Sequence, residues 1–234
     1  MSGTTESLLP GIPIQTYEIS PDGREVAYTT KSGDESQIWL ASLDHHAPPV
    51  LVAHAADTVS FGGTDELIFR SLEAKANFLT RIHKDGNGRA RISDTPILDK
   101  FRVSPDGEWV LAFVAGMSDN KLPNIVAVSV KSGELHQFCQ PECIPAQVGG
   151  WSKDGKYFLF RTDARTSTSS PGETVAIPLS PGNSLPAISN SLDVERISNT
   201  RTIRHGIVAS GSSLDVYAFL KTDLQGNLYR VPLH

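Results

Sequence analysis

The chain has 234 residues, of which 39% are hydrophobic and 20% charged, a balance that indicates a folded core and excludes a disordered chain. Its net charge is −5, and its lysines and arginines form no strong cluster, which argues against binding to the phosphates of a nucleic acid. The sequence contains no run of about 18 apolar residues, so it predicts no membrane span. Residues 1–10 lack the basic start and apolar centre of a signal peptide.

A short turn motif recurs along the chain. Ser20-Pro21-Asp22-Gly23 returns as Ser104-Pro105-Asp106-Gly107 and as Ser152-Lys153-Asp154-Gly155, and a degraded copy at residues 59–65 has Ser60 in the place of the motif serine. The copies lie about 40 to 50 residues apart, which is typical of repeat proteins. The Asp-Gly pair tolerates the positive φ of a tight hairpin turn. Serine and aspartate side chains accept hydrogen bonds from nearby backbone amides in such turns. We therefore predict a structural role in turns for Ser20, Asp22, Gly23, Ser104, Asp106, Gly107, Ser152, Asp154 and Gly155.

Each turn is followed by short apolar segments rich in aliphatic and aromatic residues, the pattern of β-strands. The first set of segments covers residues 26–28, 67–69, 110–113 and 158–160. The second set covers residues 38–43, 77–82, 125–130, 174–179 and 228–233. The fifth repeat lacks a clear turn motif, and we expect its first strands between Arg201 and Leu220. Stretches such as 49–52 and 134–138 supply a fourth strand.

Four strands in each repeat of this length predict an all-β β-propeller with about five four-stranded blades. The repeats cover residues 15–57, 58–98, 99–147, 148–196 and 197–234. One blade cannot bury both of its faces alone, so the blades must stack side by side. We expect residues 8–14 to complete the last blade; the alternative is that the chain is part of a larger propeller.

Two other folds are disfavoured. Residues 65–82 contain helix-forming residue types and neither glycine nor proline, but their apolar blocks fit the strand repeat. A β-sandwich would also contain many short strands, although it would not predict a motif that returns at this interval.

The Ser-Pro-Asp-Gly turn with its apolar strand resembles the TolB-type propeller repeat. A narrower resemblance rests on Cys139-Gln-Pro-Glu-Cys143, on the Gly-Gly-Trp-Ser-Lys-Asp-Gly run at 149–155 and on the ending at 227–233. These segments are similar to the sensor propellers of acidobacterial serine/threonine kinases. That resemblance implies a kinase domain upstream in the native protein and an extracytoplasmic position if the sensor is membrane-anchored, and otherwise a cytoplasmic one. The chain itself carries no kinase signature.

Cys139 and Cys143 are the two cysteines of the chain. Three interpretations stay open: a local disulfide in an oxidising compartment, a pair of free thiols, or part of a zinc site. His136 lies close by in the sequence, but a tetrahedral zinc site would still need a fourth ligand.

The residue types that carry chemistry form no convincing catalytic or metal-binding pattern. The run from Ala209 to Ser213 does not match the Gly-x-Ser-x-Gly elbow of a serine hydrolase. His45, His46 and His54 fit a solvated loop better than a metal site, because adjacent side chains on a strand face opposite sides. The turn aspartates lack the dense oxygen ligands of a calcium loop. We predict no catalytic residue, no cofactor and no metal.

The function expected from these patterns is a non-catalytic module that binds or senses a protein or a small molecule. Recognition would use loops at one face or around the central channel. Two alternatives remain: an accessory propeller of a hydrolase or peptidase, and a lyase- or glycosidase-type propeller. The last would need paired carboxylates or histidines that face the channel.

Overall fold

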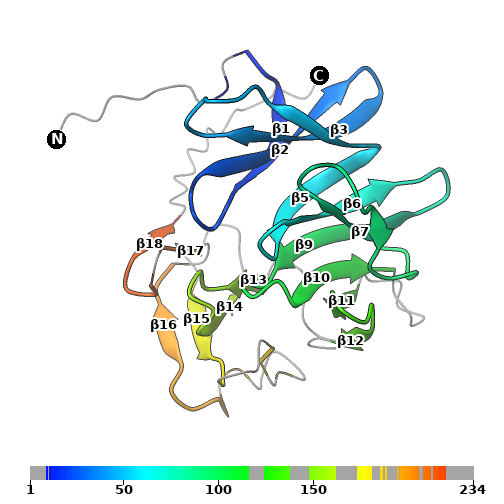
Figure 1. The fold of residues 1–234 in the computed structure, drawn as a ribbon. Helices are drawn as coiled ribbons and strands as arrows, with labels where there is room; N and C mark the ends of the chain where they lie inside the picture. Colours follow the sequence, from blue (N-terminus) through cyan, green and yellow to red (C-terminus); the bar gives the residue numbers. More distant parts are fainter. Residues whose placement is uncertain are drawn as a thin grey trace, which may run out of the picture.

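The strands form where the sequence alternates turn residues with short apolar runs. The computed structural model describes residues 9, 11–115, 124–137, 148–161, 173–180, 185–186, 188, 194, 196–205, 208–211 and 213–219. Within these residues the chain forms four sheets of four antiparallel strands and one final pair of strands (Figure 1). We call the five sheets blades 1 to 5 in chain order. In the described part of the chain, no helix has the length and hydrophobicity to cross a membrane.

Each of the first four blades is a simple meander, in which every strand pairs with the next one along the chain. Blade 1 comprises β1 (Ile14–Ile19), β2 (Glu25–Ser32), β3 (Glu35–Ser42) and β4 (Val50–His54). Blade 2 comprises β5 (Ala56–Gly62), β6 (Glu66–Leu72), β7 (Asn77–His83) and β8 (Ala90–Arg91). Blade 3 comprises β9 (Asp99–Val103), β10 (Trp109–Val114), β11 (Asn124–Ser129) and β12 (Leu135–Gln137).

Blade 4 comprises β13 (Val148–Trp151), β14 (Tyr157–Arg161), β15 (Thr174–Pro178) and β16 (Arg201–Ile203), and blade 5 comprises β17 (Val208–Ser210) and β18 (Tyr217–Phe219). The first strands of all five blades contribute residues to one central pocket. The blades therefore succeed one another around a common centre (Figure 1), and the prediction of an all-β propeller is confirmed.

The hydrophobic core lies between neighbouring blades. Ala27 and Ile38 of blade 1 pack with Leu67 and Phe69 of blade 2, while Ile68, on the other face of β6, packs against blade 3. A further cluster joins blades 3 and 4 through residues such as Leu111 and Phe158. Because the second strand of a blade is covered on both faces, its sequence is a continuous apolar run and does not alternate.

The boundary between the fourth and fifth repeats differs from the prediction. The segment 197–234 was expected to form the fifth repeat, but Arg201–Ile203 (β16) pairs with β15 and completes blade 4. The motif spacing marks where a blade begins, and it does not reveal the long connection between β15 and β16. The two described strands of blade 5 lie within the predicted interval from Arg201 to Leu220. Residues 228–233 lie outside the described part of the chain.

Residues 8–14 were predicted to complete the last blade, and of these the structure describes residues 9 and 11–14. Leu9, Ile12 and Ile14 pack against Val26 and Tyr28 of blade 1, and Ile14 pairs with Thr30 in β2. The face that they cover is the one turned away from blade 2, because the opposite face of β2 carries Ala27. Covering this apolar face is favourable, and Leu9, Ile12 and Ile14 contribute to its cover.

Candidate functional site

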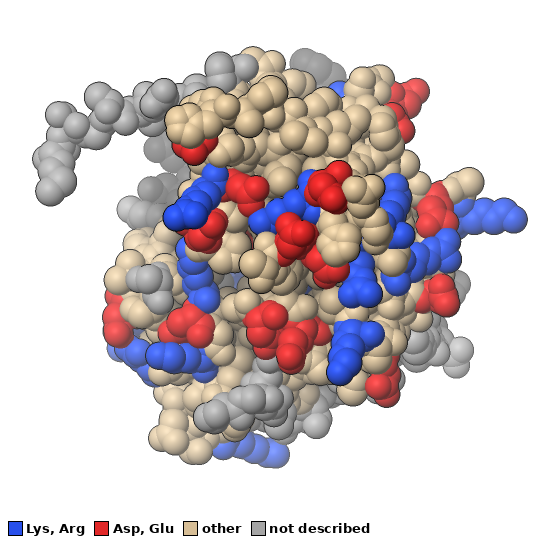
Figure 2. Space-filling view, viewed as in Figure 1, with Lys and Arg blue, Asp and Glu red and all other residues tan. Residues whose placement is uncertain are grey.

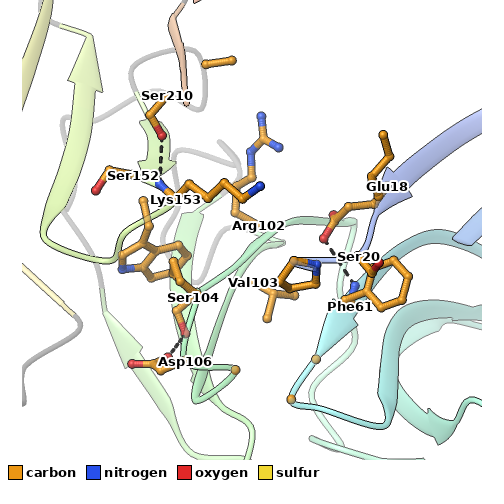
Figure 3. A pocket seen from close by; sticks show the side chains of 18 of the residues that line it. Glu18, Ser20, Phe61, Arg102, Val103, Ser104, Asp106, Ser152, Lys153 and Ser210 are labelled. Atoms are coloured by element: carbon orange, nitrogen blue, oxygen red, sulfur yellow. Dashed lines mark hydrogen bonds between the residues drawn. The ribbon is translucent and has the colours of Figure 1, made fainter. Parts of the chain in front are cut away.

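A pocket of about 840 Å³ opens where the first strands of the blades meet (Figure 3). Blade 1 lines it with Tyr17, Glu18 and Ile19, and blade 2 with Phe61. Blades 3, 4 and 5 add further residues, among them Arg102, Trp151 and Ser210. The pocket thus collects side chains from segments that lie far apart in the sequence.

The repeated turns form the rim of this pocket. Ser20 and Asp22, Ser104 and Asp106, and Ser152 are among its lining residues. In the first turn the Ser20 hydroxyl donates to Asp22 Oδ1 at 2.6 Å and accepts the Glu25 backbone N–H at 2.9 Å. The same two kinds of contact recur around Ser104 and Ser152. The hydrogen bond from Ser20, followed by the backbone N–H of Arg24, lowers the pKa of Asp22.

The glycines of these turns have positive φ, at 74° for Gly23, 74° for Gly107 and 69° for Gly155. Glycine adopts this conformation at little cost, whereas other residues rarely do. The motif aspartates and serines thus build the turns that shape the pocket rim.

One position on the first strand differs in chemistry from blade to blade in blades 1 to 4, and in blades 1 and 3 its side chain lines the pocket. We define the inner position of a blade as the residue of the first strand that pairs with the central buried residue of the second strand. The pairs are Glu18 with Ala27, Ser60 with Ile68, Arg102 with Leu111, and Gly150 with Leu159. The four inner positions therefore carry an acid, a hydroxyl, a base and no side chain.

The pairing of the first and second strands shows that Ser60 of the second repeat is not equivalent to the motif serines of the other repeats. In blades 1, 3 and 4 the motif serine stands two residues after the inner position. In blade 2 the residue at that place is Gly62. The prediction that Ser60 replaces the motif serine is wrong by two residues, because Ser60 pairs with Ile68 and the strand pairing continues to Gly62; β5 is also bulged between Asp57 and Ser60. Thr58 in this bulge has φ of 48°, which is unusual for a β-branched residue. Ser60 consequently lies on the strand and outside the turn.

A buried chain of polar groups connects the first strands of blades 1, 2 and 3. The Lys100 ammonium donates to Ser60 Oγ at 2.5 Å, and Ser60 Oγ donates to Glu18 Oε2 at 2.7 Å. The Phe61 backbone N–H donates to Glu18 Oε1 at 3.3 Å. Lys100 is only 6% exposed, and this burial lowers its pKa to about 8, although the charge of Glu18 opposes the shift.

A second polar group braces blades 2 and 3 beside this chain. The Arg70 guanidinium contacts both oxygens of Asp57, at 2.8 Å and 2.7 Å. It also lies 3.6 Å from Asp99 and donates to the Leu98 carbonyl. A bidentate arginine–carboxylate pair is among the stronger charge-assisted contacts in proteins, so Asp57 and Asp99 are held by Arg70.

Two cationic side chains face the pocket from blades 3 and 4. The stem of Arg102 lies against Gly150, where an added Cβ would stand 2.9 Å from Arg102 Cγ. Gly150 also has φ of 95°, so glycine is required there on both counts. Lys153 lies in the turn of blade 4, and its backbone N–H donates to Ser210 Oγ at 2.8 Å. Figure 3 shows both side chains at the pocket.

The other residues singled out from the sequence lie away from this pocket or outside the described residues. His54 contacts Glu35 at 3.1 Å, and His46 lies 3.8 Å from Asp44. Cys139 and Cys143 fall in residues 138–147, which are not described. Within the described ranges, no three His, Cys, Asp or Glu side chains gather as a metal site would require. Acidic and basic side chains are interspersed over the face seen in Figure 2.

Reasoning from the sequence did not predict the polar chain of Glu18, Ser60 and Lys100 or the place of Arg102 at the pocket. A signal was available for two of them, since Glu18 and Arg102 both stand two residues before a motif serine. Aligning the repeats on that position would have identified them. Lys100 carries no such signal, because its burial depends on the packing of three blades.

Comparison with known proteins relates the chain to solved propellers at the level of the fold. No family model matches the sequence, and no curated protein matches it. TolB from Acinetobacter baumannii superposes with a TM-score of 0.56 and 16% identity, over 71% of this chain and 41% of that one. A putative TolB from Agrobacterium tumefaciens gives a TM-score of 0.50 and 16% identity, over 80% of this chain and 63% of that one.

A chain of a nidogen/laminin complex gives a TM-score of 0.55 and 12% identity, over 88% of this chain and 73% of that one. The present chain thus spans less than two thirds of the length of either TolB structure. At these identities the likeness concerns architecture alone. The protein has a TolB-like β-propeller fold.

Proposed function

We propose that this chain is a non-catalytic binding module whose ligand enters the central pocket. The observation that carries the proposal is the convergence of all five blades on one cavity of about 840 Å³. Concave sites with apolar walls and a few placed polar groups are typical of ligand-binding sites. Here Tyr17, Ile19 and Phe61 supply apolar surface, and Glu18, Arg102 and Lys153 supply charge.

The geometry of the polar groups supports binding over catalysis. A serine and an amine that could form a nucleophilic pair, Ser60 and Lys100, are 3% and 6% exposed, so a substrate would not reach them. Asp22 and Asp106, two carboxylates at the pocket, each accept a hydrogen bond from the serine of their own turn.

Binding of a ligand in the pocket would be signalled to a domain outside this chain. The sequence resemblance to kinase sensor propellers supports this part of the proposal. A rigid set of blades joined by buried apolar clusters suits such a role, because a ligand that touches several blades at once can bias their packing.

Filling the pocket should abolish binding without unfolding the protein. Gly63 lines the pocket, and an added Cβ there would meet no atom within 4 Å. We expect Gly63→Tyr to place a ring in the cavity at little cost in stability. The measurement is ligand-observed NMR with a library of short peptides and small metabolites, in which wild-type hits should lose their signal in Gly63→Tyr.

The control is Ala74→Tyr, which adds the same side chain at an exposed loop residue outside the pocket and should keep every hit. Hits that persist in Gly63→Tyr would refute the pocket as the binding site. Chemical conversion of a hit by the wild-type protein, seen by mass spectrometry, would refute the non-catalytic role.

A further inference from the structure

The charged side chains that line the pocket balance one another. Among the described residues, the lining carries three acidic and three basic side chains: Glu18, Asp22, Asp106, Lys84, Arg102 and Lys153. Two charged partners lie directly behind them. Glu25 pairs with Lys84 at 2.6 Å, and the Lys100 ammonium donates to the Ser60 hydroxyl that contacts Glu18. These partners add one charge of each sign, so the formal charge of the whole group is zero.

Most of these charged groups are also engaged in contacts within the protein. The Glu18 carboxylate accepts hydrogen bonds from Ser60 at 2.7 Å and from the Phe61 backbone at 3.3 Å (Figure 3). Asp22 and Asp106 accept hydrogen bonds from the serines of their turns, and Arg102 interacts with another group of the protein. A charged ligand would lose part of its hydration on entering the cavity. The engaged groups could replace that hydration only by giving up contacts of their own.

Two apolar side chains on the first strand of blade 1 are exposed at the pocket. Tyr17 and Ile19 stand two residues apart on β1, so they lie on the same face of the sheet. They are 68% and 45% exposed, and no other large apolar residue in the described part of the chain is as exposed as Tyr17. Their cross-strand partners in β2, Tyr28 and Val26, are buried. Apolar surface of this kind in a cavity favours contact with an apolar ligand.

We propose that the ligand is an uncharged molecule whose aromatic or aliphatic body lies against Tyr17 and Ile19, and that the pocket discriminates against anions and cations alike. This inference rests on the proposed function, since it names the chemical class of the ligand for the same pocket. Phe61 of blade 2 and Trp151 of blade 4 extend the apolar wall. Burial of an apolar body is favourable in itself, so binding needs no ionic contact.

The first test uses three probes of nearly equal size that differ in charge: phenylpropionamide, phenylpropionate and phenylpropylammonium. Their binding to the whole chain is followed by NMR titration at neutral pH. We expect the amide to bind about tenfold more tightly than either ion, because the pocket does not replace the hydration that an ion loses. Tighter binding of either ion would overturn the inference, and so would the failure of the amide to bind at millimolar concentration.

Truncation of the two apolar contacts tests where the ligand lies. Tyr17→Ser and Ile19→Ser should each weaken the binding of phenylpropionamide about tenfold. Both residues are exposed, and urea unfolding verifies that the variants fold. The matched controls are Tyr217→Ser and Val50→Ser, which change exposed residues outside the pocket and should leave the affinity unchanged. Amide binding that survives both Tyr17→Ser and Ile19→Ser would refute the proposed contact.

Reversal of one charge on the rim tests the balance. Lys153 is exposed at the pocket, and Lys153→Glu gives the lining an excess of negative charge. Phenylpropylammonium should then gain about threefold in affinity over phenylpropionate. The matched control is Lys156→Glu, which makes the same change in the same turn outside the pocket and should keep the wild-type preference. An unchanged preference in Lys153→Glu would contradict selection by charge balance.

The two proposals can fail separately. If an ion binds more tightly than the amide and Gly63→Tyr abolishes that binding, the proposed function survives and only the uncharged ligand falls. If library hits are indifferent to Gly63→Tyr, the proposed function itself fails. Uncharged molecules should predominate among the library hits that Gly63→Tyr abolishes, and a majority of ions among them would count against this inference alone.

Discussion

Replacing Gly107 with alanine will destabilise the protein by about 3 kcal/mol, whereas the same change at Gly23 will cost about 1 kcal/mol. Both glycines occupy the same place in their turns and have the same φ of 74°. The backbone penalty for alanine is therefore the same. A Cβ at Gly23 meets no atom within 4 Å, but a Cβ at Gly107 would stand 2.7 Å from the backbone nitrogen of Gly63 in blade 2.

Urea unfolding of both variants and of the wild type measures this difference. The excess cost at Gly107 reports the close approach of two turns from neighbouring blades, since Gly23 serves as the internal control for backbone strain. Equal losses of stability at the two positions would show that the contact with Gly63 relaxes without cost.

The free energy of unfolding should rise with pH between about 8 and about 10, by up to about 3 kcal/mol, and Lys100→Met should remove this rise. Burial lowers the pKa of Lys100 from 10.5 to about 8 in the folded protein. Between these two values the unfolded chain binds more protons than the folded one. Raising the pH therefore opposes unfolding, and the unfavourable burial of the charged lysine is relieved.

The measurement is urea unfolding at a series of pH values, with the exposed lysine variant Lys31→Met as the control that keeps the wild-type slope. The series should stop near pH 10, because burial raises the pKa of Tyr28 and ionisation of this tyrosine in the unfolded chain then favours unfolding. A wild-type protein with no slope in this interval, or a Lys100→Met protein with an unchanged slope, would contradict the assignment.

The parts of the fold that were predicted from the sequence depend on local chemistry. Asp22 and Gly23 build a turn from contacts within five residues, so the motif reveals it directly. Leu67, Ile68 and Phe69 are all fully buried, and a short apolar run bounded by turn residues indicates such a strand. The continuation of blade 4 to β16 was not predicted, because a long connection separates it from β15.

The polar chain at the pocket depends on contacts between blades. Ser60 is 42 residues from Glu18 and 40 residues from Lys100. Its orientation follows from the bulge at Thr58, whose φ of 48° has no marker in the sequence. In the sequence, Lys100 cannot be distinguished from a surface lysine, because its burial depends on the packing of the first strands of three blades. Charged residues on a first strand could be found from the repeat register, but their partners could not.

The inner positions have a consequence for how such proteins diversify. Each of these residues belongs to a separate sheet. An exchange at Arg102 would change the charge of the cavity wall, whereas an exchange at Glu18 would also remove the acceptor of the Ser60 hydroxyl beside the buried Lys100. Homologous chains could thus acquire new specificities one blade at a time. The glycine at 150 is the exception, because any larger residue there would displace its arginine neighbour and alter two adjacent modules together.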